Sequence, residues 1–132
     1  MLFPYKDDNP RVLVPYVTYA IISINVLIFV LQLNMAMVNS SIEREFIYKF
    51  GFIPANFSFF TMFTSMFLHG GFSHIFGNMW FLWVFGDNVE GILGHIKFGI
   101  FYLLCGLVAT MSQLFVNPES TIPMVGASGA IA

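Results

Sequence analysis

Residues 16–38 read YVTYAIISINVLIFVLQLNMAMV, a run without one charged side chain. Its Val and Ile residues suit strands, but strands in globular proteins are usually only about 3–10 residues long. A helix needs about 20 apolar residues to cross the hydrocarbon core of a bilayer, and this run supplies them. We therefore predict a transmembrane helix over residues 16–38, preceded by a short polar tail over residues 1–11.

The composition of the chain agrees with this reading. Hydrophobic residues make up 58% of it and charged residues 9%, with a mean hydropathy of +0.80, whereas an ordinary soluble domain has about 25% charged residues. Two further long runs, residues 50–86 and 98–118, also lack charge. We expect an all-α, polytopic membrane helix bundle, an integral multi-pass protein of the cell membrane whose first partner is the lipid bilayer. The net charge of −2 provides no basic patch and argues against nucleic acid as a partner.

A long first loop is predicted over residues 40–72. Ser40 and Glu43 fit a capping box, and apolar residues follow at helical spacing until Gly51, which is a typical helix stop. This pattern predicts a short amphipathic helix at the membrane interface. The rest of the loop is apolar but interrupted by proline and glycine, so we expect irregular or part-helical structure that dips into the membrane and is buried by protein.

Beyond the loop, two more transmembrane helices are predicted, over residues 73–89 and 97–116. The polar and glycine-rich residues 86–94 indicate a turn between them. A loop over residues 117–123 follows, and a fourth helix begins near Ser128. Lys6, Arg11 and Lys97 would share one membrane side, against Arg44 and Lys49 on the other, so the excess of positive charge favours a cytoplasmic N-terminus.

Three features argue against other kinds of site or processing. Cys105 is the single cysteine, which excludes an intramolecular disulfide, and we read it as a small buried apolar residue. Asp7 and Asp8 do not suit the positive start of a cleavable signal peptide. We expect no metal and no other cofactor, since the five-residue spacing of His69 and His74 does not suit one helical face and no third ligand is near.

His74 and Asn78 stand four residues apart in this apolar sequence, so they face the same way from a helix. Two donors on one buried face could stabilise a developing oxyanion. They could instead join helices by hydrogen bonds. Their spacing alone leaves both interpretations open, and polar groups inside a membrane are by default a hypothesis about function.

Ser128 lies in the sequence Gly126-Ala127-Ser128-Gly129. It is either an ordinary N-cap serine or a nucleophile at a place where glycines allow close approach of another backbone. The segment does not match the G-x-S-x-G elbow of soluble hydrolases, because Ala130 occupies the place of the last glycine. We interpret Glu90 as a carboxylate that binds glycine-rich backbone rather than as a catalytic group. We likewise interpret His69 as a residue that forms hydrogen bonds with the loop backbone.

The combination is more specific than its parts. The segments HGGFSHIFGN (69–78), GDNVE (86–90) and GASG (126–129), in this order between apolar spans, resemble the rhomboid family of intramembrane serine proteases over nearly the whole chain. The resemblance implies an intramembrane serine endopeptidase that cleaves transmembrane protein substrates. It implies Ser128 as nucleophile, His74 and Asn78 as oxyanion donors, and structural support from His69 and Glu90.

The resemblance also implies a general base that the sequence does not contain. In the family this base is a histidine on a sixth helix, whereas here no histidine follows His95. A serine hydroxyl is a weak nucleophile without a base, so we expect these 132 residues to be the inactive N-terminal part of a longer protease. Two alternatives stay open, namely a rhomboid-like pseudoprotease that binds membrane proteins without cutting them, and a fragment of a transporter or channel.

Overall fold

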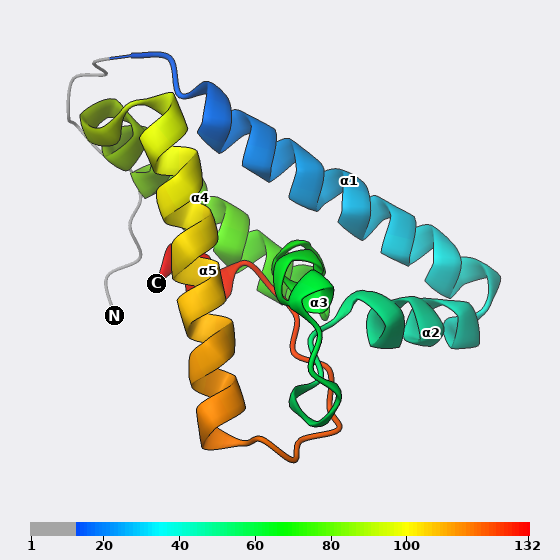
Figure 1. Cartoon of the computed structure of the whole chain (residues 1–132). Coiled ribbons are helices and arrows are strands. Elements are labelled where there is room, and N and C mark those ends of the chain that lie inside the picture. Colours follow the sequence, from blue (N-terminus) through cyan, green and yellow to red (C-terminus); the bar gives the residue numbers. More distant parts are fainter. Residues whose placement is uncertain (1–12) are drawn as a thin grey trace.

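The structure, a computed structural model, describes residues 13–132; the polar tail predicted over residues 1–11, with Lys6 and Arg11, lies outside them. Three long helices dominate the described part, α1 (Tyr16–Val38), α4 (Phe72–Leu93) and α5 (His95–Val116). Shorter helices complete it: α2 (Ser40–Phe50), η1 (Pro54–Asn56), α3 (Phe59–Thr64), η2 (Ser65–Phe67) and α6 (Ser128–Ile131) (Figure 1). The all-α prediction is confirmed for these residues, which contain no strand beyond one isolated β-bridge.

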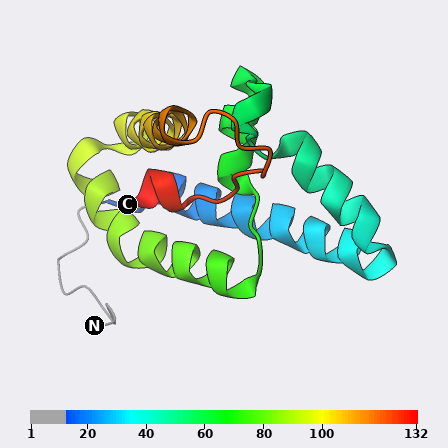
Figure 2. The ribbon, with the colours of Figure 1, turned by 90° about the horizontal axis from the view of Figure 1, so that it is seen from below.

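Helices α1 and α4 lie side by side and run in opposite directions (Figure 2). Residues at the start of α1, Val17 and Thr18, bind Glu90 near the end of α4. Gln32, near the end of α1, binds His69 just before α4 begins. These two contacts fix the antiparallel alignment of the two helices.

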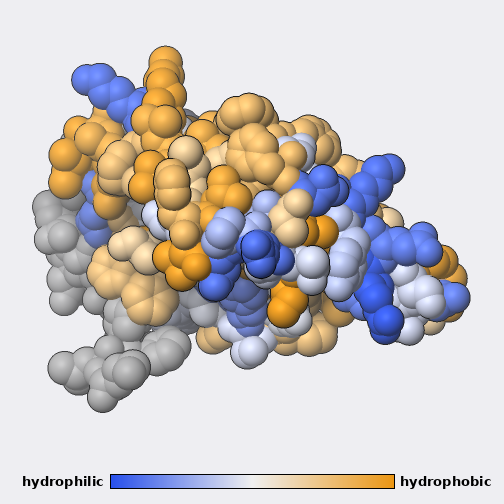
Figure 3. Space-filling view, turned by 60° about the horizontal axis from the view of Figure 1, so that its bottom comes forward, coloured by the Kyte–Doolittle hydropathy of each residue, from blue (hydrophilic) through white to orange (hydrophobic). Residues whose placement is uncertain are grey.

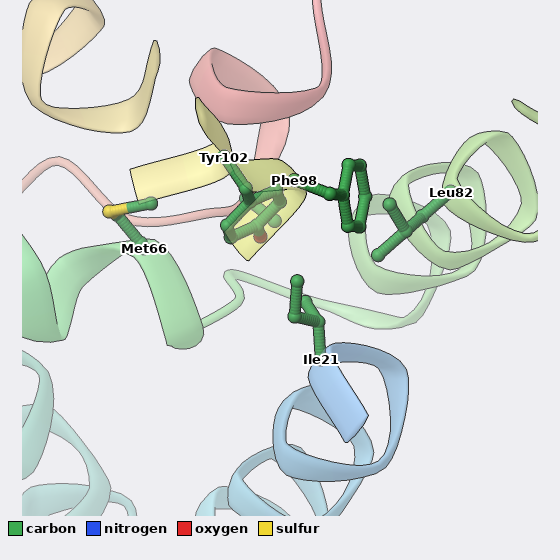
Figure 4. Packing of buried hydrophobic residues seen from close by; sticks show 6 residues of the cluster. Ile21, Met66, Leu82, Phe98 and Tyr102 are labelled. Carbon is green, nitrogen blue, oxygen red and sulfur yellow. The ribbon is translucent and has the colours of Figure 1, made fainter. Parts of the chain in front are cut away.

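Helix α5 follows α4 after a single residue, and α6 returns between them. Gly94, at φ 78°, occupies the left-handed region that glycine enters without steric cost and ends α4. Helix α6 packs against α5 and also against α4 and η2. The core where these elements meet contains Ile21, Met66, Leu82, Phe98, Tyr102 and Ala127 (Figure 4).

Two local expectations are wrong. The capping box of Ser40 and Glu43 does not form; instead Asn39 is the N-cap of α2, and its Oδ1 accepts a hydrogen bond of 2.8 Å from the amide of Ser41. Asn39 has extended backbone, so the break between α1 and α2 falls one residue earlier than expected and a carboxamide replaces the serine hydroxyl.

The polar turn predicted over residues 86–94 is also wrong, because α4 continues as helix to Leu93. Glu90 is fully buried and receives hydrogen bonds from the first turn of α1, so its polarity does not bring it to the surface. Gly86 lies inside the helix where a Cβ would come within 2.8 Å of Thr18. The glycine therefore provides room for α1 rather than ending α4.

Two helices, α1 and α5, are long and apolar enough to cross a membrane. Much of their surface is apolar and exposed in the described chain. Figure 3 shows hydrophobic side chains over much of one face, while hydrophilic ones lie toward the end that carries α2, near the middle of the view and at its upper left edge. Helix α4 does not meet the same criterion. The predicted count of three full spans and the start of a fourth is therefore not confirmed.

Candidate active site

Ser128 is the first residue of α6, and the segment before it is held by the first loop. Phe52 and Met124 form the isolated antiparallel bridge, with hydrogen bonds of 3.0 and 2.7 Å between their backbones. Two residues further on, the amide of Gly126 donates to the carbonyl of Ser65 over 2.9 Å. Phe52 and Ser65 are almost fully buried, so the serine is attached to the interior of the protein through its preceding backbone.

His74 and Asn78 occupy the first two turns of α4, on the side that faces this segment. A Cβ placed on Gly126 would lie 2.6 Å from both Cε1 and Nε2 of His74, and 3.7 Å from Nδ2 of Asn78. Gly126 also has φ 121°, a conformation that residues with a side chain rarely adopt. The glycine before the serine therefore allows the α6 segment to pass directly against the two polar side chains.

A cavity of about 690 Å³ opens between α4, α5 and α6. Its wall includes Ser128, His74 and Asn78, three residues that the sequence analysis selected, together with apolar side chains such as Phe81 and Phe98. Ser128 is exposed. The structure thus brings a hydroxyl, an imidazole and a carboxamide to one mostly apolar cavity, the arrangement expected where polar groups act on a buried ligand.

His69 lies behind this wall rather than in it. Its side chain is 1% exposed, its Nε2 is 3.0 Å from Nδ2 of Asn78, and its ring meets the His74 ring edge to face with centroids 5.2 Å apart. Burial, and secondarily the neighbouring His74, lower the pKa of His69 to about 4. The imidazole is therefore neutral near pH 7.

Glu90 is far from the serine along α4. Sixteen residues separate it from His74, which is about 24 Å in a helix. Its carboxylate accepts hydrogen bonds from the amides of Val17 and Thr18, from the Thr18 hydroxyl, and contacts Nδ1 of His95. Since those amides belong to the first turn of α1, where backbone donors lack helical partners, Glu90 caps α1 from a neighbouring helix.

The polar residues of α1 were not predicted from the sequence as part of the site. Thr18, Asn25 and Gln32 are all buried, at 0%, 0% and 1% exposure, on one face of the helix. Their spacing of seven residues in an otherwise apolar run could have revealed them, since such a period places residues on one side of a helix. Two of them bind the two ends of α4, Thr18 through Glu90 and Gln32 through His69.

The architecture and the site define a helical membrane protein with a serine set among polar donors. Comparison with known proteins specifies the family: residues 56–132 match the Rhomboid domain. The chain is 30% identical over 118 residues to rhomboid protease GluP of Bacillus subtilis, covering 89% of this chain and 23% of that protein. It is 34% identical over 115 residues to the human mitochondrial presenilin-associated rhomboid-like protein, covering 84% of this chain and 29% of the relative.

A third relative, the putative rhomboid protease YdcA of Bacillus subtilis, is 31% identical over 77 residues, which is 58% of this chain and 38% of that protein. No solved structure matches the chain. The chain belongs to the rhomboid family. It spans less than two fifths of the length of these three curated relatives.

Proposed function

We propose that this chain carries the nucleophile and the oxyanion donors of an intramembrane serine endopeptidase that cleaves transmembrane protein substrates. The observation that supports the proposal is the shared cavity wall of Ser128, His74 and Asn78, in a chain with a Rhomboid domain. Ser128 Oγ would attack a substrate carbonyl. His74 and Asn78 would donate hydrogen bonds to the negative oxygen that forms, at about 2.7–3.1 Å in the reacting complex.

The general base is assigned to the histidine of a later helix that the family resemblance implies. Of the three described histidines, His74 is assigned to the oxyanion, Nε2 of His69 meets Asn78, and His95 meets Glu90. Base and oxyanion donors would then act from different sides of the scissile carbonyl, the division of labour that nucleophilic catalysis by serine requires.

The same proposal places α1, α4 and α5 across the membrane, with α6 as the start of a further span. Asp87 and Glu90 interrupt the apolar sequence of α4 near its end. Glu90 is fully buried in the bundle, so a spanning α4 would not expose this carboxylate to lipid. Membrane helices tolerate polar side chains when these side chains face the interior of the bundle.

The experiment uses the complete protein in proteoliposomes with a transmembrane substrate. Wild type should cleave the substrate and react covalently with a fluorophosphonate at Ser128, while Ser128→Ala should lose both reactions. Ser112→Ala is the matched control, because Ser112 is exposed and its hydroxyl donates to the Val108 carbonyl of its own helix. The protease assignment would be overturned if the complete protein bound the substrate without cutting it and did not react with the fluorophosphonate. The chain would then belong to a pseudoprotease that binds membrane proteins.

A further inference from the structure

Gln32 is a buried polar side chain of α1 that the catalytic proposal does not use. Its Nε2 donates to the carbonyl of His69 over 3.0 Å, and its Oε1 accepts from the amide of His69 over 3.1 Å. Both backbone groups of one loop residue are thus bonded to one carboxamide. Such a reciprocal pair satisfies buried groups that would otherwise be costly to leave unpaired, and it fixes the orientation of the His69 backbone.

His69 transmits this orientation to the cavity wall. An amide nitrogen donates, so a hydrogen bond across the 3.0 Å between Nδ2 of Asn78 and Nε2 of His69 requires that the ring carry its proton on Nδ1. One of the two hydrogens of the Asn78 amide group is consumed by this bond. The other hydrogen remains available to a substrate near Gly126, which is two residues before Ser128.

We propose that Gln32 is a positioning residue for the oxyanion donors: it holds the His69 backbone, and the His69 ring then orients the Asn78 carboxamide toward the carbonyl attacked by Ser128. The inference rests on the proposed protease function. It goes beyond it by assigning a role to a residue on α1, which contributes no side chain to the wall of the cavity. The low pKa of His69 is consistent with the neutral ring that this hydrogen-bond chain requires.

The replacement Gln32→Met tests the inference, because methionine preserves the length of the side chain and removes both hydrogen bonds to His69. In the complete protein, Gln32→Met should lower kcat about 10-fold to 100-fold with little change in KM. A donor displaced by a fraction of an ångström weakens binding of the transition state but leaves binding of the substrate nearly unchanged. Asn34→Met is the matched control: Asn34 is exposed on the same helix and donates to the Val30 carbonyl of that helix.

A double-mutant comparison separates positioning from a general structural role. Once Asn78 is replaced by alanine, Gln32→Met should change kcat by less than about two-fold, because the group that it positions is gone. An equally large loss of kcat in both backgrounds would overturn the inference. If Gln32→Met does not accumulate in membranes, Gln32→Leu serves in its place, because leucine also removes both hydrogen bonds to the His69 backbone.

A second measurement does not depend on catalysis. Nitrogen-15 NMR of histidine-labelled protein, with the His69 signal assigned by His69→Gln, should show the Nδ1-protonated tautomer in wild type and a mixture in Gln32→Met. A wild-type ring protonated on Nε2 would overturn the inference even in an active protease. An inactive wild type with the expected tautomer and the expected mixture would instead count against the proposed function alone.

Discussion

Gly126 and His74 lie in direct contact: a Cβ on the glycine would stand 2.6 Å from two atoms of the imidazole. Such a distance is closer than nonbonded carbon and nitrogen atoms approach, so either the ring or the α6 segment would have to move. The contact joins the backbone that precedes Ser128 to one of the two side chains proposed to stabilise its oxyanion. Geometry at this glycine therefore decides whether the serine and its donors can act on one carbonyl.

We predict that Gly126→Ala lowers kcat/KM by about 100-fold or more, because a misplacement of about 1 Å at a reacting centre has effects of this size. Steady-state cleavage of a transmembrane substrate by the complete protein provides the measurement. Gly99→Ala is the control, since a Cβ there meets Val17 at an ordinary 3.6 Å. Equal activity of the two variants would show that the His74 contact is irrelevant to the reaction.

Removing the charge of Glu90 should destabilise the fold without touching the serine. Glu90→Gln places an amide NH₂ group among the donors of Val17 and Thr18, so we expect a loss of about 3 kcal/mol in the free energy of unfolding. Thermal unfolding in detergent measures it, with the exposed Glu119→Gln as the matched control. In a Thr18→Val background the loss should shrink, and a loss of the same size there would contradict the proposed partner.

The burial of His69 should make the free energy of unfolding depend on pH in a definite direction. Its folded pKa of about 4 lies below the unperturbed 6.5, so between these values the unfolded state binds more protons than the folded state. The free energy of unfolding should then fall as the pH drops from about 6.5 to about 4. Melting temperatures across this interval provide the test, and His69→Gln should flatten the curve. An unchanged slope in that variant would assign the effect to other groups.

The proposed crossing of three helices predicts which residues share a membrane side. In a Cys105→Ala background, single cysteines at Asn9 and at Lys97, which follows the corner between α4 and α5, should react with an impermeant maleimide from one side. A cysteine at Glu119, in the loop after α5, should react only from the other. Labelling of positions 97 and 119 from the same side would exclude α5 as a membrane-spanning helix.

The sequence predicted helices from long apolar runs and failed where a polar residue is buried. α1 occupies the range indicated by its uncharged run, whereas Gly86, Asp87 and Glu90 suggested a turn that is absent. A sequence does not reveal that a carboxylate will meet the first turn of another helix 72 residues earlier. The polar and glycine-rich residues were therefore assigned to a turn, and the end of α4 was placed too early.

At the site, the local spacing of residues predicted which side chains share a helical face, but contacts between residues far apart in the sequence could not be predicted. The four-residue interval of His74 and Asn78 places both on one helical face, and both line the cavity with Ser128. The partner of Gln32 could not be predicted, because His69 is 37 residues away and lies in a loop. The bridge of Phe52 with Met124 is similarly invisible, since nothing in two apolar segments specifies that they pair.

The two polar contacts along α1 also determine which changes in length the protein can tolerate. Thr18 and Gln32 are separated by fourteen residues, about 21 Å of helix, and each meets a fixed group at its own end of α4. Inserting or deleting one residue between them would turn one contact by about 100° relative to the other and shift it by about 1.5 Å. Substitutions on the outer side of α1 leave this spacing intact. During evolution, α1 should therefore accept substitutions on its outer side far more readily than insertions or deletions.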